Sequence, residues 1–84
     1  MEIPEQIKAA RVLVGMSQKE LSEQTGLSIQ TIQRIEQGKV FDRATFRTLK
    51  SISKALERAG IRFIDENEHV GVALDRKLLA EDDY

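Results

Sequence analysis

Apolar residues recur at intervals of three and four in four segments, and this pattern predicts four helices. The first helix runs from Pro4 to about Val14, and Pro4 suits a first turn, where its missing N–H costs nothing. Two short helices follow, over Ser17 to Thr25 and Ser28 to Gln37. The fourth runs from about Ala44 to Ala59, with an apolar face formed by Phe46, Leu49, Ile52, Leu56 and Ala59.

Capping signals separate the two short helices. Ser17 and Glu20 have the spacing of a capping box, in which each side chain satisfies backbone groups at the start of a helix. Gly26 can supply the positive φ that a sharp turn needs, and Gly38 has the usual position of a residue that ends a helix. Residues 17–39 therefore predict two helices joined by a tight turn.

After Gly60 the pattern becomes short and alternating, which predicts two strands, Ile61–Ile64 and Val70–Leu74, joined by a five-residue polar loop, Asp65–His69. We expect one face to carry Ile61 and Phe63 and another face to carry Val70, Val72 and Leu74. An isolated two-stranded hairpin is marginal in water, so we expect pairing with a second subunit. The predicted dimer interface comprises Ile61, Phe63, Val70, Val72 and Leu74.

Composition indicates a small soluble protein. The chain has 84 residues and no cysteine, which excludes disulfides and thiolate metal sites. It has no apolar run near the ~20 residues that span a bilayer and no basic-then-apolar signal at its start. We therefore expect a cytoplasmic protein with no membrane partner.

Charge is distributed unevenly. The net charge is −1, but residues 1–62 carry eleven Lys/Arg and seven Asp/Glu, whereas residues 63–84 carry two and seven. The chain divides into a mildly basic helical domain (1–60), a strand segment for dimerisation (61–75) and an acidic tail (76–84). The acidic end could repel DNA or bind a basic partner such as a toxin.

The third predicted helix has a face suited to base recognition. If Ile32 and Ile35 point inward, the polar residues at 30, 33, 34 and 37 point outward. Gln can form two contacts with adenine, Arg can do the same with guanine, and an exposed Ile29 can touch a thymine methyl. The alternatives are a solvated face and, for Ile29, an apolar contact near the helix cap.

The run from Gly15 to Lys39 resembles the phage-repressor and Cro type of helix-turn-helix, the Xre family. The matching residues are Gly15, Ser17, Gln18, Glu20, Leu21, Gly26, Ile32, Ile35, Glu36, Gly38 and Lys39, and Ser22 stands where alanine is usual. The resemblance extends over roughly residues 4–59. It implies a mainly α, four-helix lambda-repressor-like domain, here followed by a short C-terminal β-hairpin. The strand segment resembles that of small antitoxins, which pair a C-terminal strand across a two-fold axis.

The resemblance also implies roles for individual residues. Arg11 and Glu36 match a structural ion pair, and Gln18 matches a residue that binds a DNA phosphate. The base-reading positions are Ser28, Ile29, Gln30, Gln33 and Arg34. The phosphate positions are Ser17, Gln18, Gln37, Lys39 and Arg43. For Lys39 and Arg43 the alternative is an ordinary solvated charge, and Arg47 is a further phosphate candidate.

Catalytic chemistry finds no support in the sequence. His69 is the sole histidine, and no serine has the context that acyl transfer requires. We expect no enzyme activity, metal or cofactor. The leading hypothesis is a homodimeric repressor that binds a palindromic operator in double-stranded DNA. The alternatives are an antitoxin that also represses its own promoter and a protein-interaction module that does not bind DNA.

Overall fold

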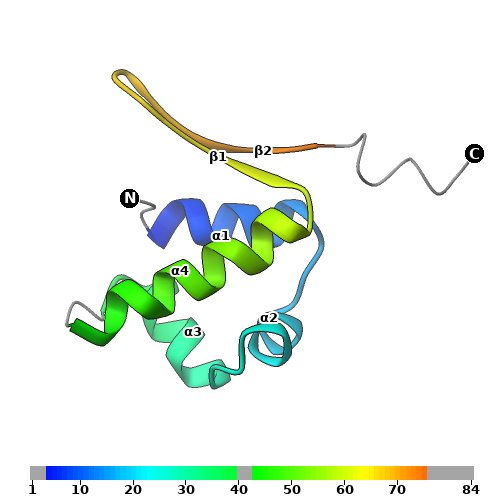
Figure 1. The fold of residues 1–84 in the computed structure, drawn as a ribbon, viewed down its shortest axis with the longest axis vertical. Coiled ribbons are helices and arrows are strands. Elements are labelled where there is room, and N and C mark those ends of the chain that lie inside the picture. Colours follow the sequence, from blue (N-terminus) through cyan, green and yellow to red (C-terminus); the bar gives the residue numbers. More distant parts are fainter. Residues whose placement is uncertain (1–3, 40–42, 76–84) are drawn as a thin grey trace, which may run out of the picture.

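The structure is a computed structural model that describes residues 4–39 and 43–75, and the side chains of residues 4–39 and 46–75. Four helices, α1 (Pro4–Leu13), α2 (Gln18–Thr25), α3 (Ile29–Glu36) and α4 (Arg43–Arg58), precede two strands, β1 (Ile61–Glu66) and β2 (His69–Leu74). The predicted fold class is confirmed. Three layers are visible in Figure 1: the hairpin, then α1 and α4, then α2 and α3.

The helix boundaries follow the sequence signals closely. Ser17 and Glu20 form the predicted capping box, with both reciprocal hydrogen bonds present. Gly26 ends α2 with φ +77°, and Gly38 follows α3 with φ +73°. Gly60, between α4 and β1, has φ +107°, and a Cβ there would lie 3.3 Å from Leu74 Cδ1. Glycine is therefore required both by the turn between the short helices and by the passage from helix to strand.

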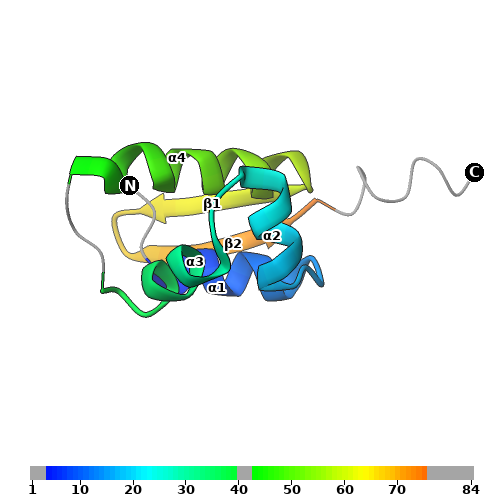
Figure 2. The same cartoon turned by 90° about the horizontal axis from the view of Figure 1, so that it is seen from below.

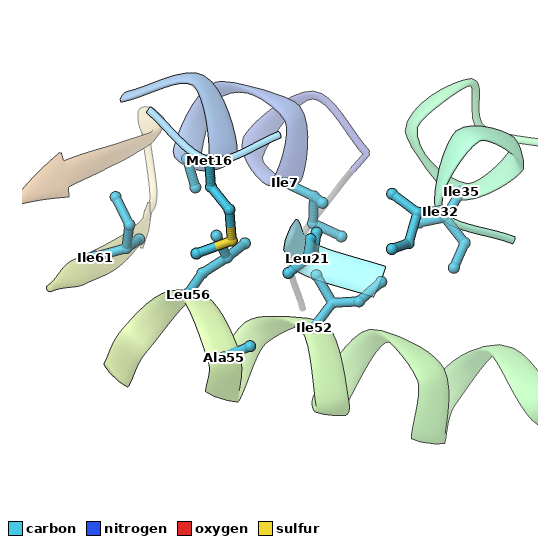
Figure 3. Packing of buried hydrophobic residues seen from close by; sticks show 10 residues of the cluster. Ile7, Met16, Leu21, Ile32, Ile35, Ile52, Ala55, Leu56 and Ile61 are labelled. Atoms are coloured by element: carbon cyan, nitrogen blue, oxygen red, sulfur yellow. The ribbon is translucent and has the colours of Figure 1, made fainter. Parts of the chain in front are cut away.

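One apolar core joins all the layers (Figure 3). Ile7, Leu21 and Ile52 occupy its centre and are fully buried. Full burial of one such side chain is worth about 1.5–3 kcal/mol. The Met16 side chain lies between α1 and Leu56 of α4, close to Ile61 at the base of the hairpin. The strands are therefore continuous with the helical core.

The expected inward position of Phe46 is wrong. Leu49, Ile52 and Leu56 of α4 do pack on the core, but the Phe46 side chain is exposed. Phe46 lies in the first turn of α4, which projects past the other helices (Figure 1). The helical spacing of Phe46 is correct, but no described helix lies opposite it to receive the ring.

The hairpin is tighter than the sequence analysis predicted. β1 pairs with β2 in antiparallel register, from Ile61 opposite Leu74 to Glu66 opposite His69. The turn therefore consists of Asn67 and Glu68 alone, and the predicted five-residue loop Asp65–His69 is wrong. The ladder continues to the polar end of each strand, because backbone pairing does not require apolar side chains.

The expectation that the apolar residues of the two strands occupy different faces is also wrong. Residues directly opposite each other in an antiparallel pair share a face, so Ile61 with Leu74 and Phe63 with Val72 point the same way. Ile61 is buried in the core, and Phe63, Val72 and Leu74 pack against it. Four of the five predicted dimer-interface side chains thus pack against the core of the same chain, and Val70 alone of the five is exposed.

A buried glutamine attaches the hairpin to α1. The Gln6 side chain is 3% exposed, and its Nε2 donates to the carbonyl oxygens of Ile64 and Gly71, both at 2.9 Å. Those two residues are directly opposite each other in the ladder. One side-chain amide on the first helix therefore holds both strands.

The predicted acidic tail, 76–84, lies outside the described residues. Within residues 4–39 and 43–75, no helix has the length and apolar character needed to cross a membrane.

Candidate nucleic-acid interface

The turn between α2 and α3 is fixed by hydrogen bonds of short range. The Gly26 N–H donates to the Ser22 carbonyl at 2.9 Å, and the Ser22 hydroxyl donates to the Leu27 carbonyl. The Thr25 hydroxyl donates to the Leu21 carbonyl at 2.8 Å and accepts from the Leu27 N–H at 3.3 Å. These bonds set the direction in which α3 leaves the turn. Ser22 thereby contributes a hydrogen bond that the usual alanine could not make.

The outward face of α3 carries the predicted base-reading residues. Ile32 and Ile35 are buried, as the spacing predicted, whereas Gln30, Gln33 and Arg34 are exposed. Ile29, 39% exposed, stands at the start of the helix. The sole carboxylate of α3, that of Glu36, is turned inward. The described outward face of α3 is therefore polar or cationic, apart from Ile29.

Two serines assigned to DNA also cap helices. The Ser28 hydroxyl accepts from the Thr31 N–H at 3.0 Å and lies 2.8 Å from the Thr31 hydroxyl. The Ser17 hydroxyl accepts from the Glu20 N–H at 3.0 Å. Both residues are exposed, so their hydroxyls remain accessible beside the helix ends. Each side chain nevertheless has a structural role that does not depend on DNA.

Arg11 and Glu36 are brought together behind α3. The Arg11 Nε donates to Glu36 Oε2 at 2.7 Å, and its Nη2 donates to Glu36 Oε1 at 3.0 Å. The two side chains are 13% and 4% exposed. Arg11 Nη1 also donates to the Met16 carbonyl at 3.0 Å, so one guanidinium connects α1, the following loop and the end of α3. Bidentate geometry of this kind gives strong, directional pairs.

Gln18 and Gln33 continue the network to the surface. Gln18 Nε2 donates to Glu36 Oε1 at 3.1 Å, and Gln33 Nε2 donates to Gln18 Oε1 at 3.3 Å. A predicted phosphate residue at the start of α2 is thus bonded to a predicted base-reading residue on α3. A direct bond between these two residues was not predicted from the sequence.

The remaining phosphate candidates flank the end of α3. Gln37 and Lys39 are exposed, and the backbone N–H groups of both close the last turn of the helix. Arg47 is exposed on α4. The Arg43 side chain lies outside the described part of the chain. No carboxylate is exposed between Arg34 and Lys39, so this end of α3 favours an anionic ligand.

The sequence of the chain was compared with models of known protein families. A family model described as helix-turn-helix matches residues 7–60, well over half of the chain. The chain belongs to this helix-turn-helix family. It is an Xre-type DNA-binding protein that belongs to transcription regulation. The match begins within α1 and ends after α4, and the hairpin lies beyond it. A search among curated proteins found no match.

Several contacts at the candidate interface and beneath the hairpin were not predicted from the sequence of this helix-turn-helix protein. Neither the Gln18–Gln33 bond nor the Gln18–Glu36 bond was predicted, although both glutamines were named. The available signal was spacing, since Gln33 and Glu36 are three residues apart on α3 and therefore neighbours. Gln6 carried a weaker signal, as a polar residue directly before Ile7 on the apolar side of α1.

Proposed function

We propose that this helix-turn-helix protein is a sequence-specific repressor that binds its operator as a homodimer, with α3 in the major groove. The observation that carries the proposal is the exposed face of α3, where Gln30, Gln33 and Arg34 stand clear of the core. Amide and guanidinium groups are the side chains that read adenine and guanine edges. Occupation of a promoter by such a dimer excludes polymerase, so repression needs no further surface.

The layer order supports this use of α3. The hairpin lies on the opposite side of α1 and α4 from α2 and α3 (Figure 1). A dimer formed through the hairpins would therefore leave both α3 helices exposed. Two recognition helices presented about 34 Å apart would read successive turns of a palindromic operator.

We further propose that the dimer forms by pairing of β2 with β2 of a second copy. In the described part of the chain, the sheet consists of β1 and β2 alone. The Asp75 N–H donates to the Gly60 carbonyl, and the turn between the strands has two residues. Both observations mean that the even-numbered residues of β1 exchange backbone hydrogen bonds with their partners on β2. The backbone groups of Val70, Val72 and Leu74 then point to the outer edge of β2, so an antiparallel pairing would centre on Val72.

Exposed apolar side chains favour this edge. Figure 2 shows β2 on the side of α1, and β1 on the side of α4. Val70 is 55% exposed on β2, and Val12 and Leu13 are exposed on α1. Leu13 follows Gln6 by two helical turns, so it lies on the stripe of α1 that faces the hairpin. Apolar surface thus lies on the same flank as the outer edge of β2.

DNA recognition is tested by selecting bound duplexes from a random library and measuring affinities for the selected site. Gln30→Ala or Arg34→Ala should cost about 1–3 kcal/mol on that site and relax discrimination at one base pair. Lys39→Ala should weaken binding to all sequences alike and reduce the salt dependence. Lys54→Ala, on the exposed side of α4, is the matched control. If Gln30→Ala and Arg34→Ala bind like the parent, α3 is not the reading helix.

The dimer is tested separately by light scattering. Val70→Pro removes an N–H that the proposed dimer uses, and should yield monomers. Val70→Thr keeps that N–H in a residue that also favours strands, and should remain dimeric. Dimers that persist in Val70→Pro would exclude this edge. A monomeric parent would refute the dimer without affecting the assignment of α3.

A further inference from the structure

The four side chains of Arg11, Glu36, Gln18 and Gln33 form one connected chain of hydrogen bonds. It begins at Arg11 on α1, passes through Glu36 at the end of α3 and Gln18 at the start of α2, and ends at Gln33. The inner pair is largely buried and Gln33 is exposed on the outward face of α3. We name these four residues the relay.

The hydrogen bonds of the relay can run in only one donor-to-acceptor direction. A carboxylate accepts hydrogen bonds and cannot donate one, so Gln18 must turn its NH₂ group toward Glu36. The Gln18 carbonyl oxygen then faces the other way and can only accept. Gln33 must therefore turn its own NH₂ group toward Gln18, as it does at 3.3 Å. The amide orientations at both glutamines follow from the charge on Glu36.

This direction determines what Gln33 offers to DNA. With one N–H bonded to Gln18, the Gln33 amide retains its carbonyl oxygen and a second N–H. An acceptor beside a donor matches the N6–H and N7 of adenine in the major groove. A reversed amide would present the two groups in the opposite order and would fit that edge poorly.

We propose that Gln18 is a positioning residue for base recognition, which fixes the orientation of the Gln33 amide so that it reads adenine. The inference rests on the proposed function, because it concerns how α3 reads DNA. It adds to the phosphate role expected for Gln18, since Gln18 also retains a second N–H. The Arg11–Glu36 pair is the largely buried end of the relay, and it anchors the two glutamines to the core.

A double-mutant cycle tests the proposal. Affinities are measured for the duplex selected by the parent protein and for duplexes changed at the base pair whose discrimination is lost in Gln33→Ala. Gln18→Met keeps the volume of the side chain but removes the amide. It should reduce discrimination at that one base pair by about fivefold or more, the low end of a bidentate contact. In the Gln33→Ala background the same change should have no further effect there.

A pure phosphate role gives a different result. Gln18→Met would then weaken all duplexes equally and leave discrimination at the Gln33 base pair unchanged, which would overturn the proposal. Additive effects of Gln18→Met and Gln33→Ala on discrimination would also overturn the proposal. So would loss of discrimination in Gln33→Ala at a base pair other than A·T. Gln24→Ala changes an exposed glutamine of α2 outside the relay and should leave discrimination unaltered.

A measurement on the protein without DNA tests the relay separately from DNA recognition. The side-chain amide NMR signals of Gln33 should shift in Gln18→Met and stay in place in Gln24→Ala. Unchanged Gln33 signals in Gln18→Met would overturn the relay. A parent protein that enriches no sequence from the library would overturn the proposed function as well. A parent that does select a site, with unaltered discrimination in Gln18→Met, would overturn the role of Gln18 alone.

Discussion

The helix-turn-helix pair α2–α3 and the β-hairpin are held in place by different kinds of contact. Within α2–α3 the caps and turn bonds join residues at most five positions apart, as between Ser22 and Leu27. The hairpin is attached to α1 by bonds from Gln6 to residues 58 and 65 positions away, and by one apolar face. The α2–α3 pair is the half of the protein proposed to read DNA, and we call it the reading half. Its caps and turn are locally determined, whereas the hairpin depends on tertiary contacts.

This difference has a functional consequence. Recognition requires α3 to leave the turn in a defined direction, and short-range bonds define that direction without a large core. Only Leu21, Ile32 and Ile35 are buried in the described parts of α2 and α3. The relay is the exception, because Arg11 ties the end of α3 to α1 across 25 positions, and Gln18 bonds Gln33 and Glu36 across 15 and 18 positions. The two regions should therefore respond differently to substitution.

The largest effect is expected where the reading half relies on a long-range contact. Glu36→Ala should lower the free energy of unfolding by about 3–5 kcal/mol, because it leaves the largely buried Arg11 guanidinium without its carboxylate. Urea denaturation monitored by circular dichroism measures this. Small domains have total stabilities of about 5–15 kcal/mol, so the variant should be close to unfolding at 37 °C.

A double variant shows whether the cost comes from the unpaired charge. Arg11→Met combined with Glu36→Leu replaces the pair with apolar side chains of similar volume and should recover most of the loss. If the double variant is as unstable as Glu36→Ala, the network as a whole stabilises the fold. The unpaired cation would then not be the cause.

An intermediate effect is expected for the contact that holds the hairpin. Gln6→Leu removes both donors to the strands while keeping an apolar side chain in a buried position, and should cost about 2 kcal/mol. Native-state hydrogen exchange should show faster exchange of the hairpin amides and little change in α2 and α3. Gln24→Leu, on the exposed face of α2, serves as the control. Equal acceleration throughout the chain would mean that the hairpin does not open as a separate unit.

The same difference explains which features the sequence could predict. Ser17, Glu20, Gly26 and Gly38 act on their immediate neighbours, so the bounds of α2 and α3 were predictable from local patterns. The face on which the apolar side chains of the hairpin lie was not predictable in this way. Whether Phe63 and Val72 share a face depends on the register of the two strands. The Gln18–Gln33 bond lay between these cases. Both residues were assigned to the DNA surface, but their contact depends on the crossing of two helices.

The smallest effects are expected when one glycine from each region is replaced by alanine. Gly26 has φ +77° and a Cβ would meet no atom within 4 Å, so Gly26→Ala tests backbone strain alone and should destabilise by about 1 kcal/mol. Gly71 in β2 has equally open space without a positive φ, so Gly71→Ala should be neutral or stabilise by up to about 1 kcal/mol. Thermal unfolding of the two variants gives the sign of each effect. Destabilisation of both would mean that the hairpin constrains its backbone as strictly as the reading half does, and the contrast between the regions would fail.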